Sequence, residues 1–272
     1  MLTRMLDDQV IRGLLQAVAA IILCLGVVAL CRRYGVRVGK EASISLVRGL
    51  VQMTIVGVVL GVLLHSSSVV GVAILVGMMF AAALTASRRL PGMPRALEMS
   101  FLAIGAGSGT VILFMLATAA LDTRISILVP VGSMIIANSM NACAQAMERF
   151  KSDVMAHVGQ IEAGLALGAT SDATVAPFVQ TSVYASLLPR LDMLKSLGLV
   201  WIPGVMAGML VSGASPVYAG VYQFLIVAMI LAASGISGVV AIALLRRQSF
   251  SRAQQLLLRP APLGGSRAES MP

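Results

Sequence analysis

The chain has 272 residues, of which 58% are hydrophobic and 11% are charged, and its mean hydropathy is +0.94. Because soluble domains carry about 25% charged residues, this composition excludes an ordinary soluble domain and indicates an all-α, polytopic membrane protein. The net charge of +9 does not indicate a nucleic-acid partner, since the basic residues lie in short clusters between apolar stretches without interleaved aromatic residues.

Seven apolar stretches are long enough to cross a bilayer as helices. They cover about residues 14–31, 44–64, 69–86, 99–121, 125–147, 197–213 and 217–245. The first could be a cleaved signal peptide, but Arg32 and Arg33 follow where a small-residue cleavage site is expected, so we interpret it as retained. We therefore expect a transmembrane domain over residues 1–247 and a tail over 248–272, which we expect to be disordered because it is rich in Pro, Gly, Ser and Arg from Leu258 onward.

The positions of Lys and Arg predict the orientation of these spans. Of the 20 basic residues, 16 fall in the loops 32–43, 87–98 and 148–196 and in the tail from Arg246, whereas three fall on the alternate side. Arg48, inside the second span, is the remaining one. We expect an outside N-terminus, and we expect the C-terminus and residues 148–196 to be cytoplasmic.

Residues 148–196 form the one long polar interlude. Its first apolar residues are spaced by three and four, which predicts an amphipathic helix: Phe150, Val154, Val158, Ile161 and Leu165. We expect this helix to end near Gly164 or Gly168, because glycine suits the left-handed position after a helix, and residues 168–172 supply turn and N-cap residues for a second helix. The second helix has its own apolar stripe and is expected to end at Pro189. Such a helix-turn-helix requires a protein partner or the membrane surface.

Residues for enzyme chemistry are not placed as an active site requires. His65 and His157 have no Ser or carboxylate partner at membrane depth. Gly39-Lys40 is followed by Glu41 and lacks the upstream glycine of a phosphate loop, so we expect no ATP or other cofactor on this chain. The cysteines lie in or beside spans at no metal-ligand spacing, and neither a disulfide nor a zinc site is expected: Cys24, Cys31 and Cys143.

Polar residues within or at the ends of the spans are candidates to line a solute path, since lipid disfavours an unsatisfied polar group. They form three pairs: Arg48 with Gln52, Asn138 with Asn141, and Tyr222 with Gln223. The alternative interpretation is a snorkelling arginine and helix-packing amides. Three GxxxG pairs, Gly57/Gly61, Gly105/Gly109 and Gly204/Gly208, would allow close helix approach.

A set of motifs across residues 40–245 resembles the FetB (YbbM) family of ABC permeases. They are Arg48-Gly-Leu-Val-Gln52, Pro130-x-x-x-Met134-x-x-x-Asn138-x-Met140, Leu167-Gly168-Ala169-Thr170, Leu188-Pro189-x-x-Asp192-x-x-Lys195-x-x-Gly198-Leu199-Val200-x-x-Pro203-Gly204 and Gly213-x-x-Pro216-x-x-Ala219-x-x-Tyr222-Gln223. The resemblance implies a permease homodimer in the bacterial inner membrane, a separate ABC ATPase subunit that binds ATP, and iron export.

The resemblance also implies a coupling site. Glu162 and Gly168, with Ala169 and Thr170, resemble the start of the cytoplasmic coupling motif of ABC importer permeases, although Gly164 stands where that motif has its second alanine. Ser215 stands where the family resemblance implies an acidic residue, so no metal ligand is assigned there. The alternatives are a non-metal solute, since iron prefers carboxylates and the spans hold no acidic cluster, and a seven-span receptor or scaffold, which would not need this turn. A membrane enzyme comes third.

Overall fold

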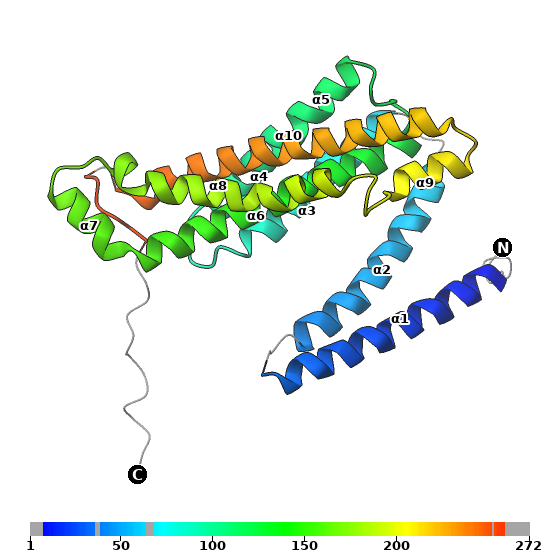
Figure 1. Cartoon of the computed structure of the whole chain (residues 1–272), viewed down its shortest axis with the longest axis horizontal. Helices are drawn as coiled ribbons and strands as arrows, with labels where there is room; N and C mark the ends of the chain where they lie inside the picture. The colour runs from blue at the N-terminus through cyan, green and yellow to red at the C-terminus, as the bar shows by residue number, and fades with distance from the viewer. Residues whose placement is uncertain (1–7, 36–38, 64–67, 252, 259–272) are drawn as a thin grey trace, which may run out of the picture. The chain divides into compact units, whose positions relative to one another are not determined.

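The computed structural model describes residues 8–35, 39–63, 68–251 and 253–258, and every regular element in these ranges is a helix (Figure 1). The chain divides into two compact units, residues 1–65 and 66–272. Six helices are long and apolar enough to cross a membrane: Ile11–Arg33, Gly39–Val59, Val69–Ser87, Ala96–Ala117, Ile125–Ala156 and Pro216–Ser249. The prediction of an all-α, multi-pass membrane protein is therefore confirmed.

The first unit is a pair of helices, α1 (Asp8–Arg33) and α2 (Gly39–Leu63). They pack together near the loop, where a Cβ on Gly39 would lie 3.5 Å from Val28 Cγ1. Most of their described apolar side chains are exposed, as is expected of helices that face lipid.

The second unit contains the remaining elements. These are α3 (Ser68–Ser87), α4 (Ala96–Ile104), the π-helical η2 (Gly105–Gly109), α5 (Thr110–Ala117), α6 (Ile125–Ala156), α7 (Val158–Ala166), α8 (Ser171–Ser196), α9 (Gly204–Val211) and α10 (Pro216–Ser249). Its core is apolar and includes the fully buried Phe150, Ile135 and Ile230.

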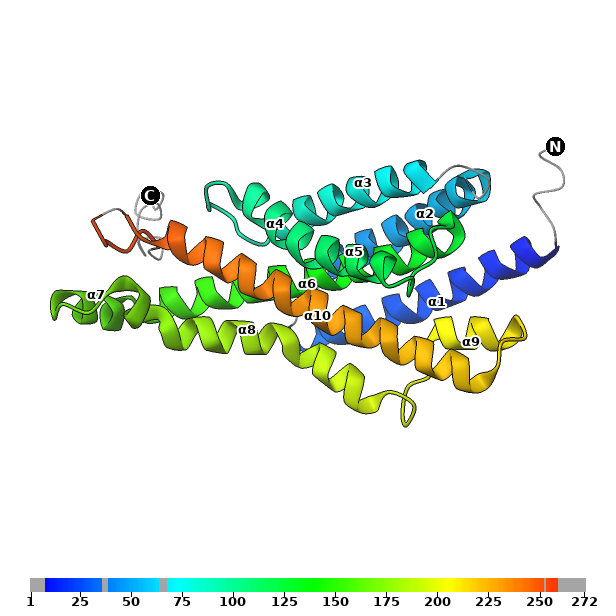
Figure 2. The same ribbon diagram turned by 90° about the horizontal axis from the view of Figure 1, so that it is seen from above.

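Helices α6 and α10 run in the same direction and pack on each other, and α8 runs back along both of them (Figure 2). At one end, His157 after α6 stacks on Phe178 of α8. At the other end, Gln223 near the start of α10 accepts a hydrogen bond from the backbone N–H of Met206 in α9. The two parallel helices have 32 and 34 residues, so they are about 48 and 51 Å long at about 1.5 Å per residue. Since the hydrocarbon core of a bilayer is about 30 Å thick, both helices extend well beyond it.

The expected span at 197–213 is wrong. This stretch forms a turn and the eight-residue helix α9, which is about 12 Å long and too short to cross a bilayer. Gly198 (φ +76°) and Gly213 (φ +86°) break the apolar run at its two ends, and Pro203 lies just before α9. The return of the chain along the bundle is instead made by α8 and α9 together.

The predicted helix-turn-helix over 148–196 needs two further corrections. Residues 148–156 continue the helix α6, and a new helix begins only at Val158. The second helix does not end at Pro189: α8 continues through Pro177 and Pro189 to Ser196. The local penalty of proline is overcome because one face of α8, including Val175, is buried along the bundle.

The tail predicted to be disordered from residue 248 is ordered at its start. α10 extends to Ser249, Phe250 pairs with Leu256 in an antiparallel bridge, and Leu256 and Leu258 are buried in the core. Burial of these two leucines is the physical reason that this part of the tail folds. Residues 259–272 lie outside the described ranges.

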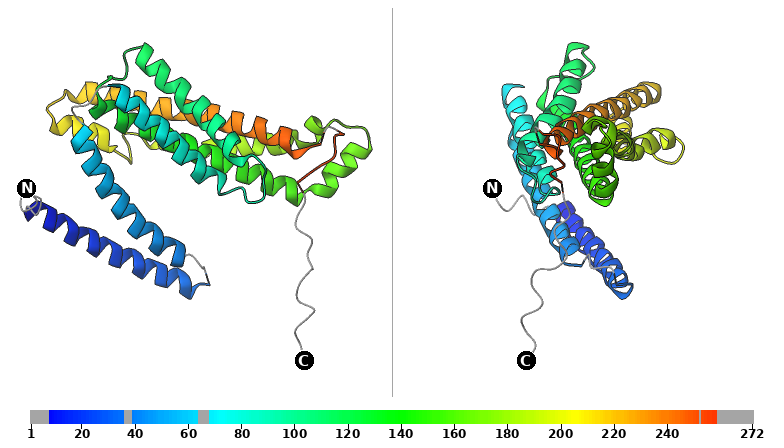
Figure 3. Two further views of the ribbon diagram at one scale, coloured as in Figure 1. Left: turned by 180° about the vertical axis from the view of Figure 1, so that it is seen from behind. Right: turned by 90° about the vertical axis from the view of Figure 1, so that its left-hand side faces the viewer.

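A close helix contact in the second unit lies where η2 packs on α10, within the bundle that Figure 3 shows from two further sides. A Cβ on Gly107 would overlap Ser237 Oγ and the carbonyl oxygen of Ala233, so only glycine permits this approach. Within each unit, the six glycines of the three GxxxG pairs would place a Cβ in open space. The GxxxG pattern therefore does not identify this contact, which uses the glycine between Gly105 and Gly109.

Candidate functional site

The turn between α7 and α8 lies at the end of the bundle where α6 and α10 finish. Gly168 has φ +89°, the left-handed conformation that favours glycine. Its N–H donates to the carbonyl of Leu165 at 3.0 Å, and the N–H of Ala169 donates to the carbonyl of Gly164 at 3.0 Å. This pair of bonds is a Schellman motif, so the predicted glycine turn is present at Gly168.

The start of α8 is capped as the sequence predicts. Thr170 is the N-cap residue, and its Oγ1 accepts a hydrogen bond from the N–H of Ala173 at 3.3 Å, which satisfies one of the free donors at a helix start. Gly164 stands where the importer coupling motif has an alanine, and the structure gives a reason for this difference. A Cβ at Gly164 would lie 2.9 Å from Thr174 Cγ2 of α8. Glycine lets α7 fold tightly back onto α8.

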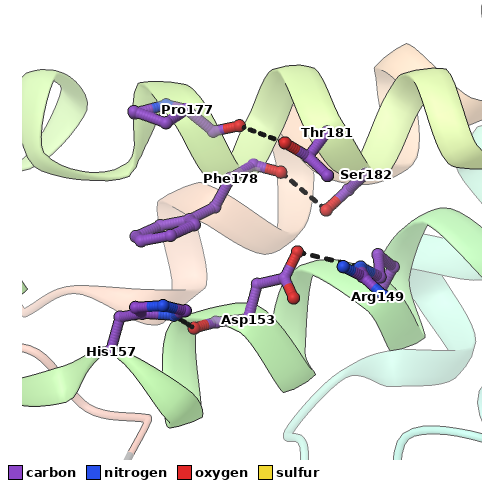
Figure 4. A network of polar contacts seen from close by, with 7 residues as sticks. All are labelled: Arg149, Asp153, His157, Pro177, Phe178, Thr181 and Ser182. Atoms are coloured by element: carbon purple, nitrogen blue, oxygen red, sulfur yellow. Dashed lines mark hydrogen bonds and ion pairs between the residues drawn. The ribbon is translucent and has the colours of Figure 1, made fainter.

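The corner between α6 and α7 is fixed to α8 by side chains (Figure 4). His157 Nδ1 lies 2.8 Å from the carbonyl oxygen of Asp153, and its ring stacks on Phe178 with ring centroids 5.0 Å apart. The Asp153 carboxylate accepts from Arg149 Nε at 3.0 Å. The imidazole thus contacts a backbone carbonyl and not the carboxylate, which is a corner-forming arrangement and not an acid–base pair.

Beside this turn lies a hollow of about 770 Å³. Its α7 side includes Glu162, Leu165 and Ala169 from the predicted coupling segment, and its other side is formed by residues 253–257 of the C-terminal segment. Of the four predicted coupling residues, Glu162 and Ala169 line this hollow and Gly168 and Thr170 lie in the adjoining turn, and all four are exposed.

The predicted path residues Asn138 and Asn141 lie half-buried on α6. Asn138 Nδ2 donates to the carbonyl of Met134 in its own helix at 2.9 Å. The main-chain oxygen of Asn138 accepts a hydrogen bond from Arg190 Nη2 of α8 at 3.0 Å, and Arg190 Nη1 donates to Gln145 Oε1 at 3.3 Å. The sequence analysis missed Arg190, which is only 5% exposed. The signal that the sequence offers is the four-residue spacing of Ser182, Ser186 and Arg190, which places them on one helix face. The structure shows that all three are buried.

The predicted pair Tyr222 and Gln223 lies near the start of α10. Gln223 is 1% exposed, and its Oε1 accepts from the N–H of Met206 at 3.2 Å, while its Nε2 has no partner among the described residues. Tyr222 is half-buried and stacks on Tyr218. In the described part of the chain, no hydrogen bond joins this pair to Asn138 or Asn141.

Arg48 and Gln52 lie in the first unit, both exposed and four residues apart on α2.

In the second unit, Ser100, Ser139, Ser234 and Ser237 are buried, and their hydroxyls have no hydrogen-bond partner within the described ranges. Outside the spans, the loop before α6 holds an ion pair in which the hydrogen bond from Arg124 lowers the pKa of Asp122. No group of three or more His, Cys, Asp and Glu side chains suited to a metal ion occurs among the described residues.

Comparison of the sequence with known proteins identifies its family. Residues 14–250 match the model of the uncharacterised protein family UPF0014. The chain belongs to the UPF0014 family. This UPF0014 member is 29% identical over 242 residues to the probable iron export permease protein FetB of Escherichia coli, a match that covers 88% of this chain and 93% of that protein.

Two plant members are similar over nearly the same extent. The chain is 29% identical over 245 residues to the UPF0014 membrane protein STAR2 of Oryza sativa, which covers 90% of this chain and 86% of that protein. It is 27% identical over 248 residues to the protein ALUMINUM SENSITIVE 3 of Arabidopsis thaliana, which covers 90% of both chains. No solved structure matches the chain.

Proposed function

We propose that this chain is the permease subunit of an ABC-type transporter in the cell inner membrane, that two copies work with a separate ABC ATPase, and that the transporter exports iron. The observation that carries this proposal is the exposed α7–α8 turn with Gly168 at φ +89°, held at the end of α6 and α10. A short helix and a tight turn at the end of helices longer than a bilayer can dock on a partner outside the membrane.

The orientation in this proposal has an outside N-terminus and a cytoplasmic C-terminus. With α6 and α10 parallel and α8 running back along both, the loops 87–98 and 157–170 and the end of α10 lie on one side, where Lys151 of α6 donates to the carbonyl of Pro91. Arg88, Arg89 and Arg95 lie in the first of these loops, and Arg246 and Arg247 end α10. Clusters of basic residues favour the cytoplasmic side, where the ATPase can reach the turn.

The homodimer in this proposal rests on the open face of α8. Gln180, Thr181 and Asp192 are exposed on this helix, although it lies along two helices that are apolar enough to cross the membrane. Polar side chains at membrane depth are disfavoured next to lipid and face other protein or a water-filled space. A second copy that covers α8 would shield them.

Iron as the solute rests on similarity to the protein named a probable iron export permease. A non-metal or anionic solute is the second candidate, because Arg190 is buried without an ion pair to any described carboxylate. A receptor or scaffold remains the alternative from another class.

The proposal is tested by expressing the chain with a candidate ABC ATPase from the same genome and measuring complex formation and ATP-dependent iron transport into inside-out vesicles. Gly168→Val should abolish ATPase binding or coupled hydrolysis, because a β-branched residue is strained at φ +89°. The matched control is Gly159→Ala in α7, where a Cβ meets open space and full activity is expected. Normal ATPase binding and coupled transport by the Gly168→Val variant would contradict the proposed coupling site.

A further inference from the structure

The C-terminal segment of residues 250–251 and 253–258, hereafter the C-terminal hairpin, is attached directly to the α7–α8 turn. After α10, the chain reverses: Ser251 N–H donates to the carbonyl of Gln255 at 2.9 Å, and Leu257 N–H donates to the carbonyl of Ser249 at 2.8 Å. The reversal places Leu256 and Leu258 in the core at 4% and 8% exposure. The C-terminal hairpin is thus anchored by apolar burial, and its tip is free to contact other elements.

The tip of the C-terminal hairpin caps helix α8. Gln254 Oε1 accepts a hydrogen bond of 3.0 Å from the backbone N–H of Ser171, which is the first residue of α8. This donor has no partner within its own helix. Thr170 caps the N–H of Ala173, so two different segments of the chain satisfy two donors at the start of one helix.

The backbone conformation of Gln254 indicates that the hydrogen bond from Ser171 to its side chain is a built-in feature of this turn. Gln254 has φ +60°, a left-handed conformation that costs a residue with a side chain about 1 kcal/mol or more. Glycine or asparagine would adopt it more easily. A glutamine in this conformation is held there by its surroundings, and its side chain makes a bond that a shorter one would not reach.

A second contact joins α10 to the same helix start. Arg246 Nε in the last turn of α10 lies 3.3 Å from Asp172 Oδ1 in the first turn of α8. Together with the Gln254 bond, this ion pair fixes the turn to the end of α10 from two directions. The C-terminal hairpin and α7 also line the hollow of about 770 Å³ from opposite sides, so the surface beside the turn is formed by both segments.

We propose that the C-terminal hairpin positions the α7–α8 turn for the ATPase and forms the second half of the docking surface. This inference rests on the proposed function, in which that turn binds the ATPase. The hairpin removes rotational freedom from the turn before docking, which lowers the entropy lost on binding. The hairpin also connects the turn to α10, which carries Gln223 near its other end. A movement of the turn on docking would therefore be transmitted to α10.

The test measures, for the full-length permease in lipid nanodiscs, the affinity of the ABC ATPase that forms a complex with it in the experiment above. Gln254→Ala removes one hydrogen bond and should weaken binding about three- to tenfold, with the thermal unfolding of the permease unchanged. Gln254→Glu should restore binding, because a carboxylate accepts from the same N–H and is favoured at a helix start. Gln254→Asn keeps an amide that suits φ +60° but is one methylene shorter, so it should behave like the alanine variant.

The ion pair between Arg246 and Asp172 allows a second, independent experiment. Asp172→Arg and Arg246→Asp should each weaken ATPase binding, and the double exchange should recover it. Unchanged affinity in Gln254→Ala together with no recovery in the double exchange would overturn the positioning role. Gly168→Val separates the two proposals: if it loses the ATPase while the hairpin variants bind normally, the proposed function stands and only this inference fails.

Discussion

Arg190 Nη2 of α8 donates a hydrogen bond of 3.0 Å to the main-chain oxygen of Asn138 in α6. Its other described partner, Gln145 Oε1, is also neutral, and its Nε has no partner in the described ranges. A buried cation that lacks a counter-ion is unfavourable, and an ionisable residue buried against a helix apolar enough to cross a membrane is a candidate functional position. This hydrogen bond joins the predicted path residue Asn138 to a buried charge that the sequence analysis assigned to the cytoplasmic segment 148–196.

The first prediction concerns this charge. Arg190→Met replaces the guanidinium by an apolar chain, and replacing a buried charge in this way is often neutral for stability. We expect the variant to insert and unfold at nearly the same temperature, while transport falls about tenfold or more because a charged hydrogen-bond donor is lost. Transport assays and thermal unfolding on the same preparation check this, and normal transport would assign Arg190 a packing role only.

The second prediction concerns the contact between η2 and α10. Gly107→Ala should destabilise the bundle by about 1–3 kcal/mol, since the added methyl group overlaps Ser237 and the Ala233 carbonyl. Gly109→Ala, two residues away in the same π-helix, places its methyl group in open space and should leave stability unchanged. Thermal unfolding in detergent compares the two, and equal stability would show that η2 does not approach α10 this closely.

The third prediction separates path residues from packing residues. Gln223→Ala leaves the Met206 N–H unsatisfied and should destabilise the protein by about 1–3 kcal/mol. A loss of transport in this variant would therefore reflect lost stability and would not place Gln223 on the path. Asn141→Ala, Asn138→Ala and Gln52→Ala should lose transport while unfolding normally if these residues line the path. Normal transport by all three would make them helix-packing groups.

The fourth prediction concerns topology. A reporter that is active only outside the cytoplasm should give signal when it is inserted at residues 65–68, and none when it is fused after Leu258. Fusion at Leu258 preserves the C-terminal hairpin, which fusion at Arg247 would remove. The opposite pattern would reverse the proposed orientation, and a single inverted site would show that α8 and α9 do not return the chain across the bilayer.

The sequence by itself determined the features that depend on composition or on a few neighbouring residues. The apolar content identified a membrane protein, and the long apolar runs gave most of the spans. The Gly168 turn and the Thr170 cap were predictable because left-handed backbone and N-cap bonding are properties of the residues at those positions. The spacing also predicted which side chains of the segment 150–165 turn inward: Phe150, Val154 and Ile161 are buried, and Val158 and Leu165 are half-buried, although the predicted single helix is divided between α6 and α7.

Only the tertiary structure decided which helix returns the chain, where Arg190 lies and what the tail does. Local rules end a helix at Pro189, but packing along α6 and α10 holds α8 together through both prolines. The apolar run at 197–213 satisfied a hydropathy test and still formed only a short helix. The C-terminal hairpin folds because Leu256 and Leu258 find a core built by distant residues, and a local sequence pattern contains no information about such a partner.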